Sequence, residues 1–172
     1  MKRESGFTLV ELLIVVAIMG ILASMAIMSM VRAKTAANES SAIGAMRTIT
    51  SAQIVYSTSC GSGSFAVDLT TLAEHPPTTT VPFLPPDLTN AAVVTKSGYR
   101  IQMRAAAGAV VGPVDCNGIQ TFTHAYASAE PIAFGTTGSR SFATLSPTNV
   151  IWQLPGAVAP VEPFPAPAQT VQ

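Results

Sequence analysis

Apolar residues dominate the first part of the chain without interruption. From Leu12 to Val31 the sequence carries no charged residue, and only one glycine and two serines are not hydrophobic. As a helix this run would span about 30 Å at roughly 1.5 Å per residue, which is the thickness of the hydrocarbon core of a bilayer. A helix in the core of a soluble protein would show a polar stripe, and none is visible here. The pattern therefore predicts a membrane-spanning helix over about residues 7–31.

Beyond Arg32 the apolar positions recur at spacings of three and four, which place them on one face of a helix. They are Ala42, Ala45, Met46, Ile49, Ala52 and Tyr56. The polar residues expected away from this face are Asn38, Glu39, Arg47 and Gln53. No proline interrupts the chain before His75. The sequence therefore predicts one long helix over residues 7–58, with a membrane half followed by an amphipathic half.

Strand signals follow the helix. Tyr99, Ile101 and Met103 alternate with polar residues, as on a half-buried strand. Three further runs have strand character, at Phe122–Tyr126, at Arg140–Leu145 and at Val150–Leu154. We expect four antiparallel strands to cover the apolar face of the helix, in a globular head over residues 59–154. The predicted fold class is α+β.

Two stretches of the chain are rich in proline, one within the predicted head and one after it. His75–Pro86 holds five prolines and is expected to be an irregular loop, after a short helix or turn at Asp68–Glu74. Residues 155–172 hold five more prolines among small residues, which predicts an extended, mobile tail.

The apolar N-terminus could also be a secretory signal peptide or an ordinary single-pass anchor. A signal peptide would use Lys2 and Arg3 as its basic region and a cleavage site near Ala26. The apolar run is longer than the usual 7–15 residues of such a peptide and follows an acidic residue, Glu11, which argues against a signal peptide. For a single-pass anchor, Lys and Arg flank the span on both sides, so the charges do not fix its orientation.

The residues ahead of the span are more specific. Ser5-Gly6-Phe7-Thr8-Leu9-Val10-Glu11-Leu12 resembles the cleavage motif of type IV prepilins and of type II secretion pseudopilins. The resemblance implies a leader at residues 1–6, cleavage by a prepilin peptidase between Gly6 and Phe7, and N-methylation of Phe7. Many members of the family carry a proline where this chain has Met28, and without that proline the sequence does not predict a helix kink at this position.

Glu11 is a carboxylate at the edge of an apolar span, which is a costly position and therefore suggests a function. Cleavage after Gly6 would place a new α-amino cation on Phe7, one helical turn away. Glu11 could neutralise the amine of its own chain. The family resemblance implies instead that Glu11 meets the amine of a neighbouring subunit during filament assembly, and we favour that interpretation.

The resemblance also implies a pilin-like fold and a structural function. The expected protein is a type IV pilus subunit that polymerises with copies of itself into a helical filament. A type II secretion pseudopilin or a minor pilin is the alternative, and a secreted protein with a signal peptide is a more distant one. The expected partners are prepilin peptidase and the pilus assembly machinery. Before assembly the chain would lie in the inner membrane with a periplasmic ectodomain, and afterwards in an extracellular pilus or a periplasmic pseudopilus.

Cys60 and Cys116 are the only cysteines. If the ectodomain lies in the periplasm, a disulfide between them is favoured over two free thiols. The alternative is a metal site that combines them with His75 and His124. None of the four stands at a paired metal-binding spacing, so no metal is expected.

The charge of the chain and the motifs in its sequence limit which other functions are expected. The chain has nine basic and nine acidic residues and only 10% charged residues overall, so no net field attracts it to nucleic acid. Lys96, Arg100 and Arg104 could share the outer face of one strand and make weak contacts with phosphates, but a solvated strand face is the simpler interpretation. No nucleophile elbow, phosphate loop or zinc-protease motif occurs. We expect no enzyme activity and no cofactor.

Overall fold

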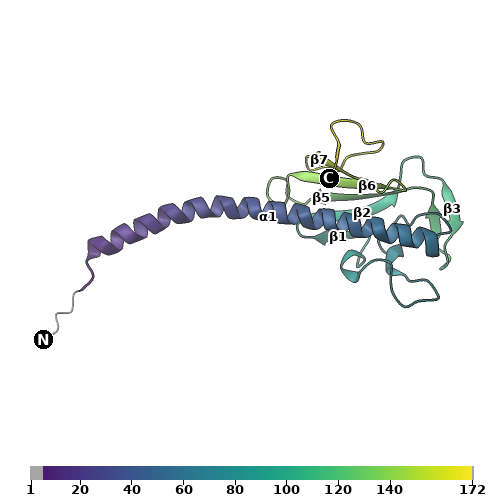
Figure 1. Cartoon of the computed structure of the whole chain (residues 1–172), viewed down its shortest axis with the longest axis horizontal. Helices are drawn as coiled ribbons and strands as arrows, with labels where there is room; N and C mark the ends of the chain where they lie inside the picture. The colour runs from purple at the N-terminus through teal and green to yellow at the C-terminus, as the bar shows by residue number, and fades with distance from the viewer. Residues whose placement is uncertain (1–5, 172) are drawn as a thin grey trace. The chain divides into compact units, whose positions relative to one another are not determined.

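The computed structural model describes residues 6–171, which form two compact units (Figure 1). The N-terminal unit ends at Lys34 and the C-terminal unit begins at Thr35. A single helix, α1 (Leu9–Ser59), contributes to both units and is 51 residues long. This confirms the predicted long helix. The leader residues Lys2 and Arg3 lie outside the described residues.

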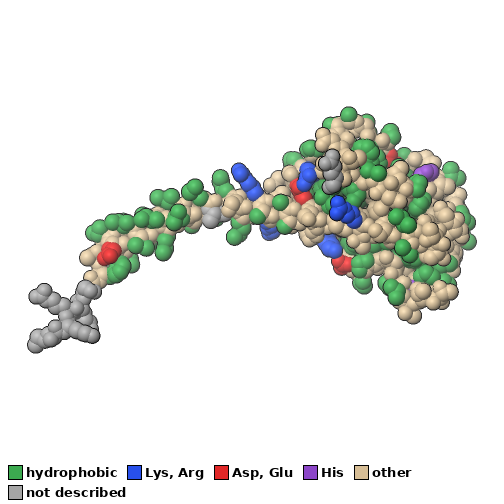
Figure 2. All heavy atoms as spheres, in the orientation of Figure 1, with side chains coloured by type: hydrophobic (Ala, Val, Ile, Leu, Met, Phe, Trp, Pro, Cys, Tyr) green, Lys and Arg blue, Asp and Glu red, His purple; other side chains and the backbone are tan. Residues whose placement is uncertain are grey.

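The N-terminal unit is a bare apolar helix. Every side chain described from Phe7 to Lys34 is exposed, and α1 continues without a break through Gly20 and Met28. Hydrophobic side chains cover the visible face of this unit (Figure 2). Within residues 6–171, α1 is the one helix that is long and apolar enough to cross a membrane.

The C-terminal unit is built around a six-stranded antiparallel sheet with the strand order β1-β2-β5-β6-β7-β8. The strands of this sheet are β1 (Val93–Lys96), β2 (Tyr99–Ala105), β5 (Ala125–Pro131), β6 (Arg140–Ser146), β7 (Ile151–Pro155) and β8 (Gln169–Thr170). A separate hairpin holds β3 (Val111–Val114) and β4 (Gln120–Phe122), and two short 3₁₀ helices span Thr71–Ala73 and Pro86–Leu88.

The core lies between α1 and the sheet. The six helix positions predicted from their spacing are all buried, and they pack in one cluster with side chains of the sheet such as Tyr99, Ile101 and Phe142. Burial at this spacing stabilises the C-terminal half of α1 through packing rather than through helix propensity. The α+β fold, with a long helix against an antiparallel sheet, is therefore confirmed.

Two polar residues that were expected away from this face are buried, and that expectation is wrong for both. Gln53 is 1% exposed, and its amide exchanges two hydrogen bonds with the backbone of Ala66. Glu39 is 5% exposed and is held by residues near the start of β6. Because partners distant in sequence satisfy both groups, each polar side chain is tolerated in the core.

The predicted strand over Phe122–Tyr126 is also wrong as one element. The β4 strand ends at Phe122 and β5 begins at Ala125, with the exposed His124 between them. The β5 strand lies in the interior of the sheet between β2 and β6. Its alanine and serine side chains are buried on both faces and give no alternating pattern. A strand that is buried on both faces loses the period of two that would reveal it.

The expected mobile tail over residues 155–172 instead folds back on the sheet. The ring of Phe164 stacks on Trp152, with 5.3 Å between ring centroids, and on Tyr126, with 6.3 Å. The hydroxyl of Tyr126 donates to the carbonyl of Pro160 at 2.8 Å. The β8 strand then pairs with β7. Burial of these aromatic faces provides the stabilisation that holds a proline-rich segment in place.

Candidate processing and assembly site

The site predicted at the N-terminus lies where the chain enters α1. Gly6 and Phe7 precede the helix and are exposed, with Phe7 72% accessible. Thr8 is the residue before the first helical position. Its hydroxyl accepts a hydrogen bond from the backbone N–H of Glu11 at 3.2 Å, and its carbonyl accepts one from Leu12 at 3.3 Å. Thr8 is therefore the N-cap of α1.

Thr8 and Glu11 also stand at the spacing of a capping box, in which a hydroxyl residue is followed three positions later by Glu or Gln. Sequence reasoning assigned no role to Thr8, although this spacing is a signal that the sequence contains. Glu11 lies in the first turn, where a negative charge interacts favourably with the helix dipole. The cap therefore fixes the residue at which the helix begins, and so fixes the position of Glu11 along the helix axis.

This arrangement suits proteolytic processing. The bond between Gly6 and Phe7 is outside the helix, so a peptidase could bind it as an extended segment without unwinding α1. Cleavage there would leave an amine on Phe7, one residue before the N-cap, and four positions before Glu11. An amine cation and a carboxylate would then stand at the same end of an apolar helix.

A comparison with known families bears on this same segment. Residues 1–27 match the family model of the prokaryotic N-terminal methylation motif. The chain carries the signature of type IV pilins and pseudopilins. Across the comparisons made with curated proteins and with solved structures, no further match was found. The pilin signature implies, in general, assembly into filaments and processing by a prepilin peptidase. It suggests a structural protein rather than an enzyme. Together with the apolar helix, the signature fits membrane anchoring before assembly.

The predicted disulfide is present in the C-terminal unit. Cys60 and Cys116 are bonded, with their Cα atoms 4.8 Å apart, and join the end of α1 to the turn between β3 and β4. Next to it the hydroxyl of Tyr56 donates to Asp115 at 2.7 Å. Burial and the neighbouring Asp115 carboxylate raise the pKa of Tyr56. Asp115 also accepts the backbone N–H groups of Asn117 and Ile119, a role that the sequence analysis missed.

We expect loss of this disulfide to lower the free energy of unfolding by roughly 4 kcal/mol, because it closes a loop with a sequence separation of 56 residues. The measurement is urea unfolding of the full chain in mild detergent, followed through Trp152, the only tryptophan. A chain with both Cys60→Ser and Cys116→Ser should match the reduced wild type. Reductant should leave that variant unchanged, and equal stability of the reduced and oxidised wild type would contradict the prediction.

The three basic residues considered for phosphate contact do not share one strand. Lys96 lies on β1, while Arg100 and Arg104 lie on β2, so the expectation of one strand face is wrong for Lys96. A hairpin turn at Ser97 and Gly98 separates the two strands. Each cation is paired with a different carboxylate, at N–O distances between 2.5 and 3.5 Å. The pairs are Lys96–Asp87, Arg100–Glu130 and Arg104–Glu162. These pairs reduce the field available to a phosphate.

The four side chains considered for metal binding form no ligand cluster, because Cys60 and Cys116 are bonded to each other. Among residues 6–171 no group of three or more His, Cys, Asp and Glu side chains could hold a metal ion. His75 and His124 are both exposed.

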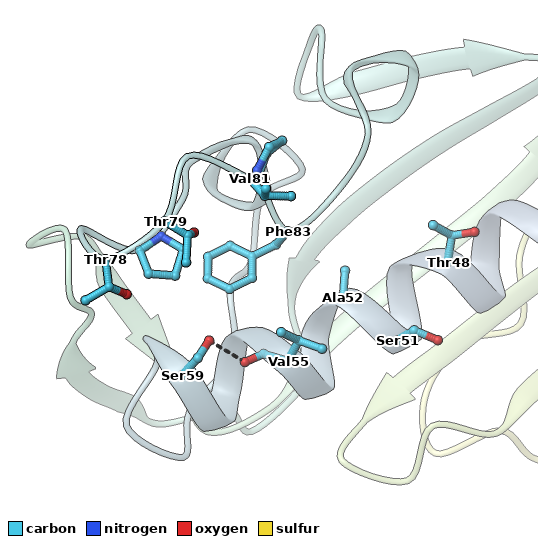
Figure 3. Close-up of a pocket in the computed structure, with 11 residues that line it drawn as sticks. Thr48, Ser51, Ala52, Val55, Ser59, Thr78, Thr79, Val81 and Phe83 are labelled. Carbon is cyan, nitrogen blue, oxygen red and sulfur yellow. Dashed lines mark hydrogen bonds between the residues drawn. The ribbon is translucent and has the colours of Figure 1, made fainter.

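A pocket of about 480 Å³ lies in the C-terminal unit between α1 and the loop over residues 76–83 (Figure 3). The residues that line it are apolar or carry hydroxyl groups, and none is ionisable. The lining therefore offers no group for acid–base or metal chemistry.

Proposed function

We propose that this protein is a structural subunit of a type IV pilus. It is stored in the inner membrane, cleaved after Gly6, methylated on the amine of Phe7, and polymerised through its N-terminal helix. The observation that carries the proposal is the methylation motif at residues 1–27 on a helix whose first half is apolar and exposed. An apolar surface of this size requires lipid or other protein to cover it. Lipid covers it before assembly and copies of the same helix cover it in a filament.

Glu11 gives this helix packing a register. One carboxylate at the edge of each apolar helix can neutralise one N-terminal amine of a neighbour, so an axial shift that separates the two charges leaves both unpaired in an apolar surrounding. N-methylation retains the positive charge of the amine and so retains the pair. The disulfide is typical of a domain in an oxidising compartment, which agrees with a periplasmic ectodomain.

A type II secretion pseudopilin, or a minor pilin of the same filament, is the second candidate. The observation that favours it is the motif itself, because pilins and pseudopilins share this signature. In that case the same processing and the same helix packing would build a periplasmic pseudopilus.

The mass of the mature chain tests the processing step. We expect a chain that starts at Phe7 and carries one additional methyl group, measured by intact-protein mass spectrometry of the membrane fraction. Gly6→Val should retain the leader, because the peptidase would meet a branched side chain at the cleaved bond. Gly20→Ala, within the span, should be processed as the wild type is. A mature chain that starts near Ile27 would show a signal peptide and overturn the proposal.

A further inference from the structure

The pocket between α1 and the loop over residues 76–83, called here the helix–loop pocket, is formed in advance of any occupant. Ala52 and Val55 face it from the helix, and Phe83 faces it from the loop (Figure 3). Phe83 packs edge-on against Tyr56, with 5.2 Å between ring centroids. The backbone N–H of Leu84 donates to the carbonyl of Leu72 at 2.9 Å and fixes the end of the loop. A ligand would therefore meet a preformed apolar wall.

The chemistry of the pocket selects an apolar and uncharged occupant. Val55 is 54% exposed and Val81, on the loop, is 71% exposed. The polar groups of the lining are hydroxyls, such as those of Thr48 and Ser51, and no charged side chain lines it. An apolar group could enter without desolvating a charge, whereas a charged group would find no partner.

The C-terminal unit carries exposed apolar and uncharged side chains on the turn between β5 and β6. We call residues 132–138 the apolar turn. Ile132 and Phe134 are each 57% exposed, and the segment has no charged residue. Among the described residues of the C-terminal unit, Phe134 is the one exposed side chain of the Phe, Tyr and Trp type. Aromatic side chains are the usual anchors of protein interfaces.

The apolar turn is also rigid. The backbone N–H groups of Gly135 and Thr137 donate within the turn, to Gly138 and Ala133, each at 2.8 Å. The side chain of Asn38, on α1, donates to the carbonyl of Thr137 at 3.0 Å. The display of Phe134 therefore needs little further loss of backbone entropy on binding.

The positions of the two surfaces on α1 separate the apolar turn from the pocket of its own chain. The apolar turn contacts the helix at Asn38, whereas the pocket lies around Val55, so they are about 25 Å apart along the helix axis at roughly 1.5 Å per residue. When one patch of a chain binds a different patch of the next copy, the contact is heterologous and can repeat into an open helical assembly. That is the symmetry of a filament.

We infer that the apolar turn of one subunit docks in the helix–loop pocket of the next, with Phe134 as its anchor. The occupant of the pocket is a second copy of this chain. The inference rests on the proposed filament function and adds a contact between C-terminal units to the packing of the N-terminal helices. Because α1 forms one wall of the pocket, the same helix takes part in both contacts.

Disulfide crosslinking tests the contact in the full chain. Ala133→Cys and Ser51→Cys, combined in one chain that keeps the Phe134 anchor, should give a ladder of covalent multimers when sheared filaments are oxidised and separated without reductant. The native cysteines are paired with each other, so crosslinks between subunits form through the added thiols. Each single variant should give no ladder. The matched control combines Ser51→Cys with Val158→Cys, an exposed valine outside the apolar turn that is expected to give no ladder.

A second measurement does not depend on crosslinking. Phe134→Ala should reduce the yield of filaments by more than about tenfold, as expected for loss of an aromatic anchor, and Val158→Ala should leave it unchanged. Filaments of the Ala133→Cys, Ser51→Cys chain that give no ladder, or an equal ladder from the control pair Ser51→Cys and Val158→Cys, would overturn the docking contact and leave the pilus proposal standing. A wild-type chain that forms no filament and starts near Ile27 would overturn both.

Discussion

We expect Glu11→Ala to leave the chain inserted in the membrane and to abolish filament assembly. Removal of the carboxylate makes the apolar span more apolar, and insertion then becomes more favourable, since an ionised group costs up to about 3 kcal/mol within a span. Assembly would lose the only acidic group between Phe7 and Val31. The measurement is the amount of subunit in sheared filaments compared with the membrane fraction.

The size of this effect follows from the pair that Glu11 would form. A carboxylate and an amine at 4 Å interact with about 4 kcal/mol at an effective dielectric constant of 20, before the cost of desolvation. A filament repeats the contact at every subunit, so its loss accumulates along the assembly. Normal filaments from Glu11→Ala would show that the carboxylate serves its own chain alone, and would contradict the intersubunit role.

Thr8→Ala is the matched control, because it removes the other half of the capping box. The variant loses the hydroxyl that accepts the N–H of Glu11 but retains the carboxylate. It should weaken the first turn by about 1 kcal/mol, a local effect that packing of the long helix can offset. Filaments from Thr8→Ala together with none from Glu11→Ala would assign the assembly defect to the charge rather than to fraying of the helix.

The sequence was most informative where its signals are local. The apolar run, the spacing of Ala42 to Tyr56 and the absence of proline predicted α1 to within two residues at its N-terminus and one at its C-terminus. The two cysteines suggested their own pairing because no other cysteine competes for either one. Thr8 belongs with these local signals, since its spacing to Glu11 is a recognised capping pattern that needs no tertiary information.

The structure was needed where a residue depends on a distant partner. The polarity of Gln53 argued for the surface, and only the backbone of Ala66 shows why it is buried. The small side chains of β5 carry no period because both neighbouring strands and both faces cover them. No local pattern around Phe164 indicates that its ring stacks on Trp152, and this stacking fixes the last segment of the chain. Tertiary context in each case overrides the local pattern.

Glu39 is the clearest buried polar group of this kind, and its loss should have a large effect on the stability of the C-terminal unit. One carboxylate oxygen accepts the N–H and the hydroxyl of Ser139, at 2.8 and 2.7 Å. The other accepts two N–H groups of Arg140, at 2.9 and 2.6 Å. Arg140 also donates to Gln153 at 2.7 Å. This network joins α1 to the start of β6 across about a hundred positions of sequence.

We expect Glu39→Ala to lower the free energy of unfolding by about 2–4 kcal/mol, because it leaves the guanidinium of Arg140 and the N–H of Ser139 without their acceptor. The partial exposure of Arg140 keeps the value below that of a fully buried pair. Urea unfolding of the full chain in mild detergent, followed through Trp152, measures it. The matched control is Glu74→Ala, an exposed carboxylate that should change stability by less than about 0.5 kcal/mol.

The same carboxylate should make stability depend on pH. Burial raises the pKa of Glu39, but the hydrogen bonds from Ser139 and the charge of Arg140 outweigh it and hold the pKa below its usual value. A group whose pKa is lower in the folded state stabilises the fold above its unfolded pKa, about 4.3 for Glu, and loses that contribution as the pH falls through the folded value. Wild type should therefore lose stability below about pH 5 more steeply than Glu39→Gln does. Parallel pH profiles for the two chains would show that this carboxylate contributes nothing to the acid sensitivity of the fold.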